Sequence, residues 1–121
     1  MDEPGSLRGC DHLDNCVSTQ DPPEDARHHM EPLKYDGDEA AAKARLNKII
    51  AEMPRTKLVE EDGNYLHFTF ATAIFRFTDD VEFLFEPDAK QIHFRSASRI
   101  GNGDLGVNRK RMTAIRKAWE G

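Results

Sequence analysis

The chain has 121 residues, of which 38% are hydrophobic and 32% charged, and its formal net charge at pH 7 is −5. A chain of this length forms one domain and buries roughly two-thirds of its unfolded surface without metal or disulfide support. The composition excludes a collagen, a coiled coil and a small disulfide scaffold, and no apolar run approaches the roughly 18 residues of a membrane span. No apolar signal segment follows Met1, so the compartment stays open, with the cytoplasm as the default expectation.

Charge is distributed unevenly along the chain. Residues 1–39 carry a net charge of −8, residues 40–99 are neutral overall, and residues 100–121 carry +3. Long-range attraction to nucleic acid requires a positive field, so the overall balance argues against a nucleic-acid partner. The sequence does not indicate an oligomeric state.

The chain is predicted to divide into an irregular N-terminal arm, residues 1–31, and a single α+β domain, residues 32–121. Proline and glycine interrupt the arm, which sustains no hydrophobic period. Cys10 and Cys16 lack the spacing of a zinc knuckle. They can form a disulfide only in an oxidising compartment, and free thiols are the expected state.

The first regular element is a predicted helix over residues 38–53. An acidic capping sequence at residues 36–39 precedes it, and Pro54 ends it. Its apolar residues share one face at helical spacing: Ala42, Leu46, Ile49, Ile50 and Met53.

Residues 56–98 then alternate between apolar and polar side chains, which predicts a meander of four to five antiparallel strands. Turns are expected at residues 62–63, 78–80 and 87–90. All seven phenylalanines lie between positions 68 and 94, and all are predicted to face inward.

A second amphipathic helix is predicted over residues 105–119, with Asp104 as its cap. Met112, Ile115 and Trp119 share its apolar face. Two such helices and one apolar sheet face predict an α+β fold in which both helices cover the same face, in the order arm-α-β-β-β-β-α.

The polar face of the sheet holds the first candidate site. The expected turns place Arg76 opposite Glu82 and Glu82 opposite Arg95, so the three side chains should form one row. Two interpretations are open. The row is either a solvated ladder of ion pairs or a platform whose guanidinium groups hold a carboxylate or phosphate.

Residues 101–106 form a Gly-x-Gly-x-x-Gly sequence between the last strand and the last helix. A dinucleotide site also requires a parallel strand after that helix, and none is predicted, so no cofactor is expected. The amides of this turn can hold an anion at the helix start, or the glycines serve only a tight turn. The acidic residues 79–82 and the pair His28 and His29 are interpreted as turn and surface residues, so no metal is expected.

Four segments, spanning about residues 10–119 together, carry a distinctive pattern. They are residues 15–18 (NCVS), 49–65, 74–83 (IFRFTDDVEF) and 95–111, which begins RSASR and ends DLGVNRKR. In these segments the chain resembles a family of bacterial and plastid proteins classified as domain of unknown function 1499. The resemblance implies a fold and no established activity.

The family pattern includes both the polar row and the glycine-rich turn. The resemblance therefore implies a single site, with the arm around Asn15 and Cys16 docked against it. The residues of this predicted site are Arg76, Glu82, Arg95, Ser98, Arg99, Asn108 and Arg109.

The sequence thus predicts a small soluble module that binds an anionic small molecule, a carboxylate or a phosphate, through these arginines. One alternative is an enzyme in which Glu82 or a nearby histidine is the general base and the arginines stabilise a developing anion. The other is a structural or protein-interaction domain in which the ion pairs only set the strand register.

Overall fold

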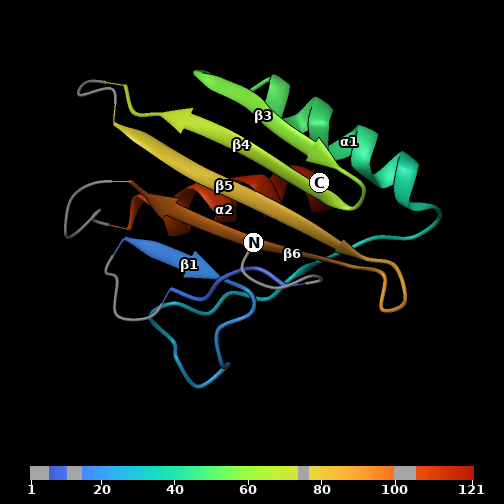
Figure 1. The fold of residues 1–121 in the computed structure, drawn as a ribbon, viewed down its shortest axis with the longest axis horizontal. Helices are drawn as coiled ribbons and strands as arrows, with labels where there is room; N and C mark the ends of the chain where they lie inside the picture. The colour runs from blue at the N-terminus through green and yellow to red at the C-terminus, as the bar shows by residue number, and fades with distance from the viewer. Residues whose placement is uncertain (1–5, 11–14, 74–76, 100–105) are drawn as a thin grey trace.

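A computed structural model describes residues 6–10, 15–73, 77–99 and 106–121. One antiparallel sheet carries two helices on one face, which confirms the predicted α+β class (Figure 1). The helices are α1 (Glu39–Ala51) and α2 (Val107–Glu120). The strands are β1 (Cys16–Ser18), β2 (Leu33–Lys34), β3 (Thr56–Asp62), β4 (Tyr65–Ala71), β5 (Thr78–Glu86) and β6 (Gln91–Ser98).

Within the described residues, the sheet has six strands in the order β1-β6-β5-β4-β3, and β2 also pairs with β6. The four strands β3 to β6 are the predicted meander. Part of the predicted arm adds to it, because β1 pairs antiparallel with the C-terminal half of β6. Among the described residues, no helix is both long and apolar enough to cross a membrane.

Each helix begins close to its predicted start, but with a different cap. Asp38, rather than Asp36, caps α1, and its carboxylate accepts a 2.7 Å hydrogen bond from the amide of Ala41. Gly106, with φ of +80°, stands at the cap position of α2. The predicted cap of α2, Asp104, lies outside the described residues.

The core lies between the helices and the inner face of the sheet, as the alternation predicts. Phe83 at its centre is fully buried, and its ring meets that of Phe68 edge to face at 5.9 Å. The helices contribute Ala42, Leu46, Ile50, Met112, Ile115 and Trp119 to the same cluster. Phe77 departs from the prediction, because it is 44% exposed.

The turn predicted at residues 78–80 is wrong. Thr78 begins β5, so Asp79 and Asp80 lie inside a strand and point to opposite faces. Asp79 pairs with Arg111 of α2 and Asp80 pairs with Arg99. Partners distant in sequence thus stabilise an extended conformation that the local turn preference of aspartate disfavours.

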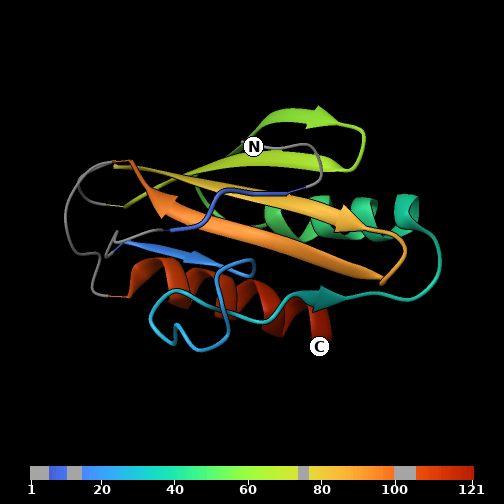
Figure 2. The same ribbon diagram turned by 60° about the horizontal axis from the view of Figure 1, so that its bottom comes forward.

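The outer face of the sheet is covered in part by residues 6–10, which cross β6 and β5 opposite the helices (Figure 2). Leu7 packs there against Tyr65 and Leu84. Cys10 packs against Cys16 and Ala97. This cover explains why the central strands are buried on both faces.

Candidate functional site

The pairing of Glu82 with Arg95 across β5 and β6 is confirmed. Arg95 Nη1 lies 3.8 Å from Glu82 Oε1, and the hydroxyl of Tyr65 donates to the other carboxylate oxygen. Arg95 is only 6% exposed because residues 6–10 lie over it, and its Nε donates a 3.4 Å hydrogen bond to the carbonyl of Gly9. The row is therefore a covered ion pair and not an open platform.

Burial also shifts the ionisation of this group of side chains. It lowers the pKa of Arg95, although the nearby carboxylate of Glu82 opposes the shift. Burial, followed by the hydrogen bond to Glu82, raises the pKa of Tyr65, so the phenol stays protonated and remains a donor. The carboxylate of Glu82 and the guanidinium of Arg95 thus already interact with groups of the protein itself.

Arg76, the third predicted member of the row, lies outside the described residues. The residue opposite Glu82 in β4 is His67, so the strand register expected on that side of Glu82 is wrong. Arg99 reaches the same outer face and binds Asp80 through two hydrogen bonds of 2.8 and 2.9 Å. His67 Nε2 lies 2.7 Å from the same carboxylate.

The carboxylate of Asp80 is held ionised by these two neighbours. Burial opposes ionisation, but the hydrogen bonds from Arg99 and His67 outweigh it and keep the pKa of Asp80 below its usual value of 3.8. A carboxyl whose pKa is depressed in the folded state stabilises the protein above its unfolded pKa. That stability is lost as the pH falls through the folded pKa.

The stability difference between the wild type and Asp80→Asn should therefore depend on pH. We expect the variant to be less stable at about pH 7, and the difference to shrink below about pH 4 as Asp80 becomes protonated. Urea unfolding at several pH values measures it. Asp88→Asn, in the exposed turn after β5, is the matched control and should show little effect at any pH. A difference that grows on acidification would contradict the assignment.

Two other predicted site residues, Ser98 and Asn108, lie on the inner face beneath the first turn of α2. Asn108 is fully buried, and its amide donates to Ser98 Oγ at 3.1 Å and to the carbonyl of Asn15 at 3.0 Å. Ser96 Oγ donates to the amide oxygen of Asn108 at 2.6 Å. The predicted docking of the arm near Asn15 is thus made by Asn108.

The same cluster contains a buried ion pair that was absent from the predicted site. Arg111 Nη2 lies 2.6 Å from Asp79 Oδ2, and its Nη1 lies 2.8 Å from the amide oxygen of Asn108. The guanidinium also stacks over the ring of Phe70 at 4.9 Å. Arg111 follows Asn108 by three helical positions, which is the one signal in the sequence that places the two together.

Arg109 lies apart from both groups. Its Nη2 donates to the carbonyls of Ala26, Arg27 and His29 at 3.1 to 3.2 Å. Those predicted residues that the structure describes are therefore divided among the outer face, the inner face and the contacts that hold the arm, and they do not surround one cavity.

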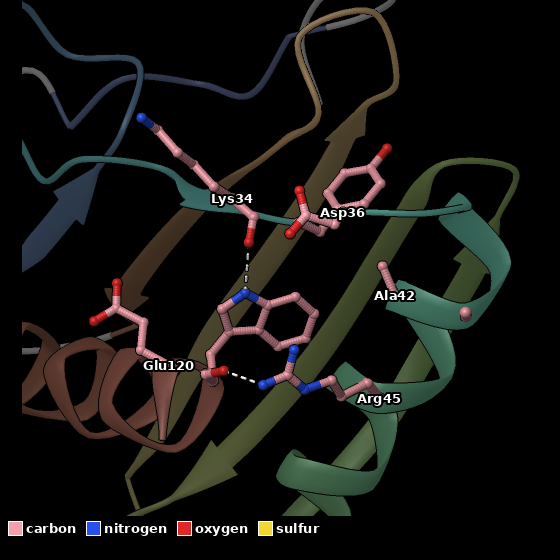
Figure 3. A pocket seen from close by; sticks show the side chains of 8 residues that line it. Lys34, Asp36, Ala42, Arg45 and Glu120 are labelled. Atoms are coloured by element: carbon pink, nitrogen blue, oxygen red, sulfur yellow. Dashed lines mark hydrogen bonds between the residues drawn. The ribbon is translucent and has the colours of Figure 1, made fainter.

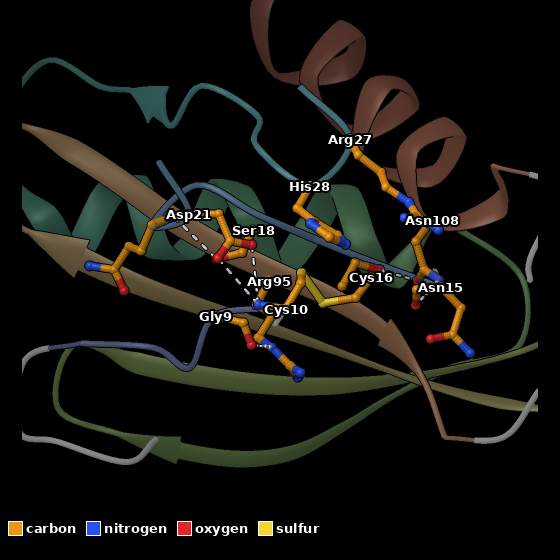
Figure 4. The surroundings of a disulfide bond; sticks show 12 residues. Gly9, Cys10, Asn15, Cys16, Ser18, Asp21, Arg27, His28, Arg95 and Asn108 are labelled. Atoms are coloured by element: carbon orange, nitrogen blue, oxygen red, sulfur yellow. Dashed lines mark hydrogen bonds between the residues drawn. A yellow bond between two sulfur atoms is a disulfide. The ribbon is translucent and has the colours of Figure 1, made fainter. Parts of the chain in front are cut away.

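The arm is also fastened by a disulfide between Cys10 and Cys16, so the expectation of free thiols is wrong (Figure 4). Both cysteines are buried, and the amide of Cys10 donates to the carboxylate of Asp21 at 3.1 Å. The bond ties the segment that crosses the outer face to the edge strand β1. Tertiary proximity decides this pairing, because the spacing alone allows either state.

The acidic residues near the start of β5 do not form a metal site. Asp79 faces α2, whereas Asp80 and Glu82 face outward, so the three carboxylates cannot meet at one ion. A different group, Asp21, Asp25 and His28, brings ligand atoms within 4.8 Å of one another. In this group His28 Nδ1 lies 2.7 Å from Asp25 Oδ2. This direct interaction explains why the two side chains lie close together, and no ion is needed.

The pocket in Figure 3, of about 480 Å³, opens between Lys34, Asp36 and the facing ends of the two helices. Arg45 stacks on the indole of Trp119 at 4.3 Å and donates to the carbonyl of the same residue. Carboxylates and cations both line this pocket, so it has no preference for an anion.

A second pocket, of about 420 Å³, has a different lining. It lies between the segment after α1, the end of β4 and the first turn of α2. The residues are Met53, Pro54, Arg55, Phe70, Ala71, Thr72, Ala73, Val107, Lys110 and Arg111. We call it the cationic pocket, because three basic side chains and no carboxylate are among these residues.

Fold and contacts together define a small α+β protein whose sheet carries helices on one face and a disulfide-clipped arm on the other. The family model described as protein of unknown function (DUF1499) matches residues 6–119, and the chain belongs to this family. No curated protein and no solved structure matches the chain. Membership confirms the resemblance and assigns no activity.

Proposed function

We propose that this protein is a binding module for a small amphipathic anion, which it holds in the cationic pocket. The observation that carries the proposal is the lining: among the described residues it combines apolar side chains with Arg55, Lys110 and Arg111 and includes no carboxylate. Carboxylates and phosphates favour such sites because guanidinium and ammonium groups donate charge-assisted hydrogen bonds.

The position of the pocket in the fold adds to this preference. Val107 and Lys110 belong to the first turn of α2, which contains no acidic residue, and Arg111 begins the second turn. The unpaired amides at a helix N-terminus carry a partial positive charge that attracts anions. The guanidinium of Arg111 is largely buried and already paired with Asp79, so Arg55 and Lys110 are the basic groups that meet a ligand.

The apolar lining limits the class of ligand. Met53, Pro54 and Phe70 are among the apolar residues that line it beside the basic side chains. A carboxylate with a short hydrocarbon or aromatic portion buries that surface, and an inorganic ion does not. We therefore favour an organic carboxylate or a phosphate monoester over free phosphate.

The outer-face arginines support this proposal less than the cationic pocket does. Arg95 is covered and paired with Glu82, and Arg99 is committed to Asp80. The enzyme hypothesis also gains little support. It needs a general base that can reach a substrate, whereas Glu82 accepts a hydrogen bond from Tyr65 beneath the arm.

Calorimetric titration with octanoate, with octanol as its neutral counterpart and with inorganic phosphate, tests the proposal. We expect octanoate to bind and octanol and phosphate to bind at least about tenfold more weakly, because each lacks one of the two recognised features. The double variant Arg55→Gln/Lys110→Gln should weaken octanoate binding about tenfold or more. Lys48→Gln, an exposed position on α1 outside the pocket, is the control and should leave binding unchanged.

Equal affinity for octanoate and octanol would contradict anion recognition. Octanoate binding that survives the double variant would place the ligand elsewhere. Absence of binding by octanoate at millimolar concentration would remove the proposed ligand class.

A further inference from the structure

The two edge strands of the sheet differ in whether their outer backbone groups are hydrogen-bonded. At the β1 edge, Ser18 forms a parallel bridge with His29, its amide donates to the carbonyl of His28 at 2.8 Å, and its carbonyl accepts from the amide of Met30 at 3.3 Å. At the other edge is β3, beyond which no further strand pairs within the described part of the chain. One edge is thus capped by the arm, and the other leaves its backbone groups open to a partner.

The open edge is unusually apolar at its centre. Every residue of β3 after Thr56 is exposed, including Leu58 at 43% and Val59 at 49%. A register shift against β4 lies between Leu58 and Glu60, which leaves Val59 without a partner in that strand. Between β3 and α1, a pocket of about 360 Å³ lies beside Leu58 and Phe68. Apolar side chains on an exposed edge favour pairing with another strand.

Charge along β3 indicates which strand fits. Lys57 lies near its N-terminal end, and Glu60 and Asp62 lie near its C-terminal end. All three are paired with outer-face residues of β4, so they share one face of the sheet. In an antiparallel pair related by a two-fold axis, the basic end of each strand lies against the acidic end of the other.

We propose that a second copy of this chain pairs antiparallel with β3, so that the two sheets join across a two-fold axis near Val59. This arrangement satisfies the open backbone groups, covers Leu58 and Val59, and places Lys57 beside the partner's acidic end. α1 runs beside this edge (Figure 1). A seven-residue strand makes a small interface, so we expect a reversible dimer whose share rises with protein concentration.

Sedimentation velocity over a concentration series measures the dimer dissociation constant. Lys57→Glu should raise this constant about tenfold, because it sets acidic groups against each other at both ends of the interface. The double variant Lys57→Glu/Glu60→Lys should restore it to within about threefold, because opposite charges then face each other again. Lys117→Glu makes the same charge change on α2, away from β3, and should have no effect.

Val59→Lys provides a second variant at an exposed position, and it should also give a monomer. Circular dichroism checks that each variant keeps the fold. A wild type that stays monomeric at the highest concentration would overturn the proposal and would mean that the register shift and charges of β3 protect the edge. Failure of the double variant to recover, or an equal effect of Lys117→Glu, would also overturn it.

Discussion

Replacing Phe83 with alanine is expected to lower the free energy of unfolding by about 3–5 kcal/mol. Phe83 is fully buried between the helices and the centre of the sheet, opposite Phe94 of β6 and in edge-to-face contact with Phe68. Removing the ring loses its transfer free energy and leaves a cavity that the strands on either side are too constrained to fill. Urea unfolding followed by circular dichroism measures the change.

Phe77→Ala is the matched control for this prediction. Phe77 is 44% exposed, so the same chemical change there removes a partly buried ring and should cost clearly less, about 1 kcal/mol. If both variants lost the same stability, or if Phe83→Ala were neutral, the inner face of the sheet would have to be the opposite one.

Arg111→Met is the second substitution with a large expected effect, a loss of about 3–5 kcal/mol. The side chain of Asp79 is only 1% exposed and that of Arg111 only 9%. Among the described residues, the second carboxylate oxygen of Asp79 has no hydrogen-bond partner, so the guanidinium is its main compensation. Removing the arginine leaves a buried negative charge without its partner.

The double variant Asp79→Leu/Arg111→Met separates a lost charge partner from lost packing. It removes both charges, so we expect it to recover most of the stability that Arg111→Met loses. If the double variant were as unstable as the single one, the stacking of Arg111 on Phe70 and its hydrogen bonds to Asn108, rather than the ion pair, would carry the stabilisation.

The candidate site shows that a local sequence pattern predicts the register of neighbouring strands better than it predicts contacts between side chains distant in sequence. Alternation places Glu82 opposite Arg95 correctly, because neighbouring strands of a meander are joined by short turns. The register expected on the other side of Glu82 is wrong, because Asp79 and Asp80 lie in β5, where they pair with Arg111 and Arg99, instead of forming a turn. Such long-range pairs act only in the folded chain and leave no periodic signal in the sequence.

The sequence by itself determines the α+β class, the meander and the face on which the helices pack, since these follow from hydrophobic period and from glycine and proline positions. Only the tertiary structure decides how the arm is used. The arm adds β1 to the sheet, contains the disulfide between Cys10 and Cys16, and covers the ion pair of Arg95. The physical reason is that hydrophobic burial depends on a repeating pattern along the chain, whereas these contacts join single groups that no such pattern marks.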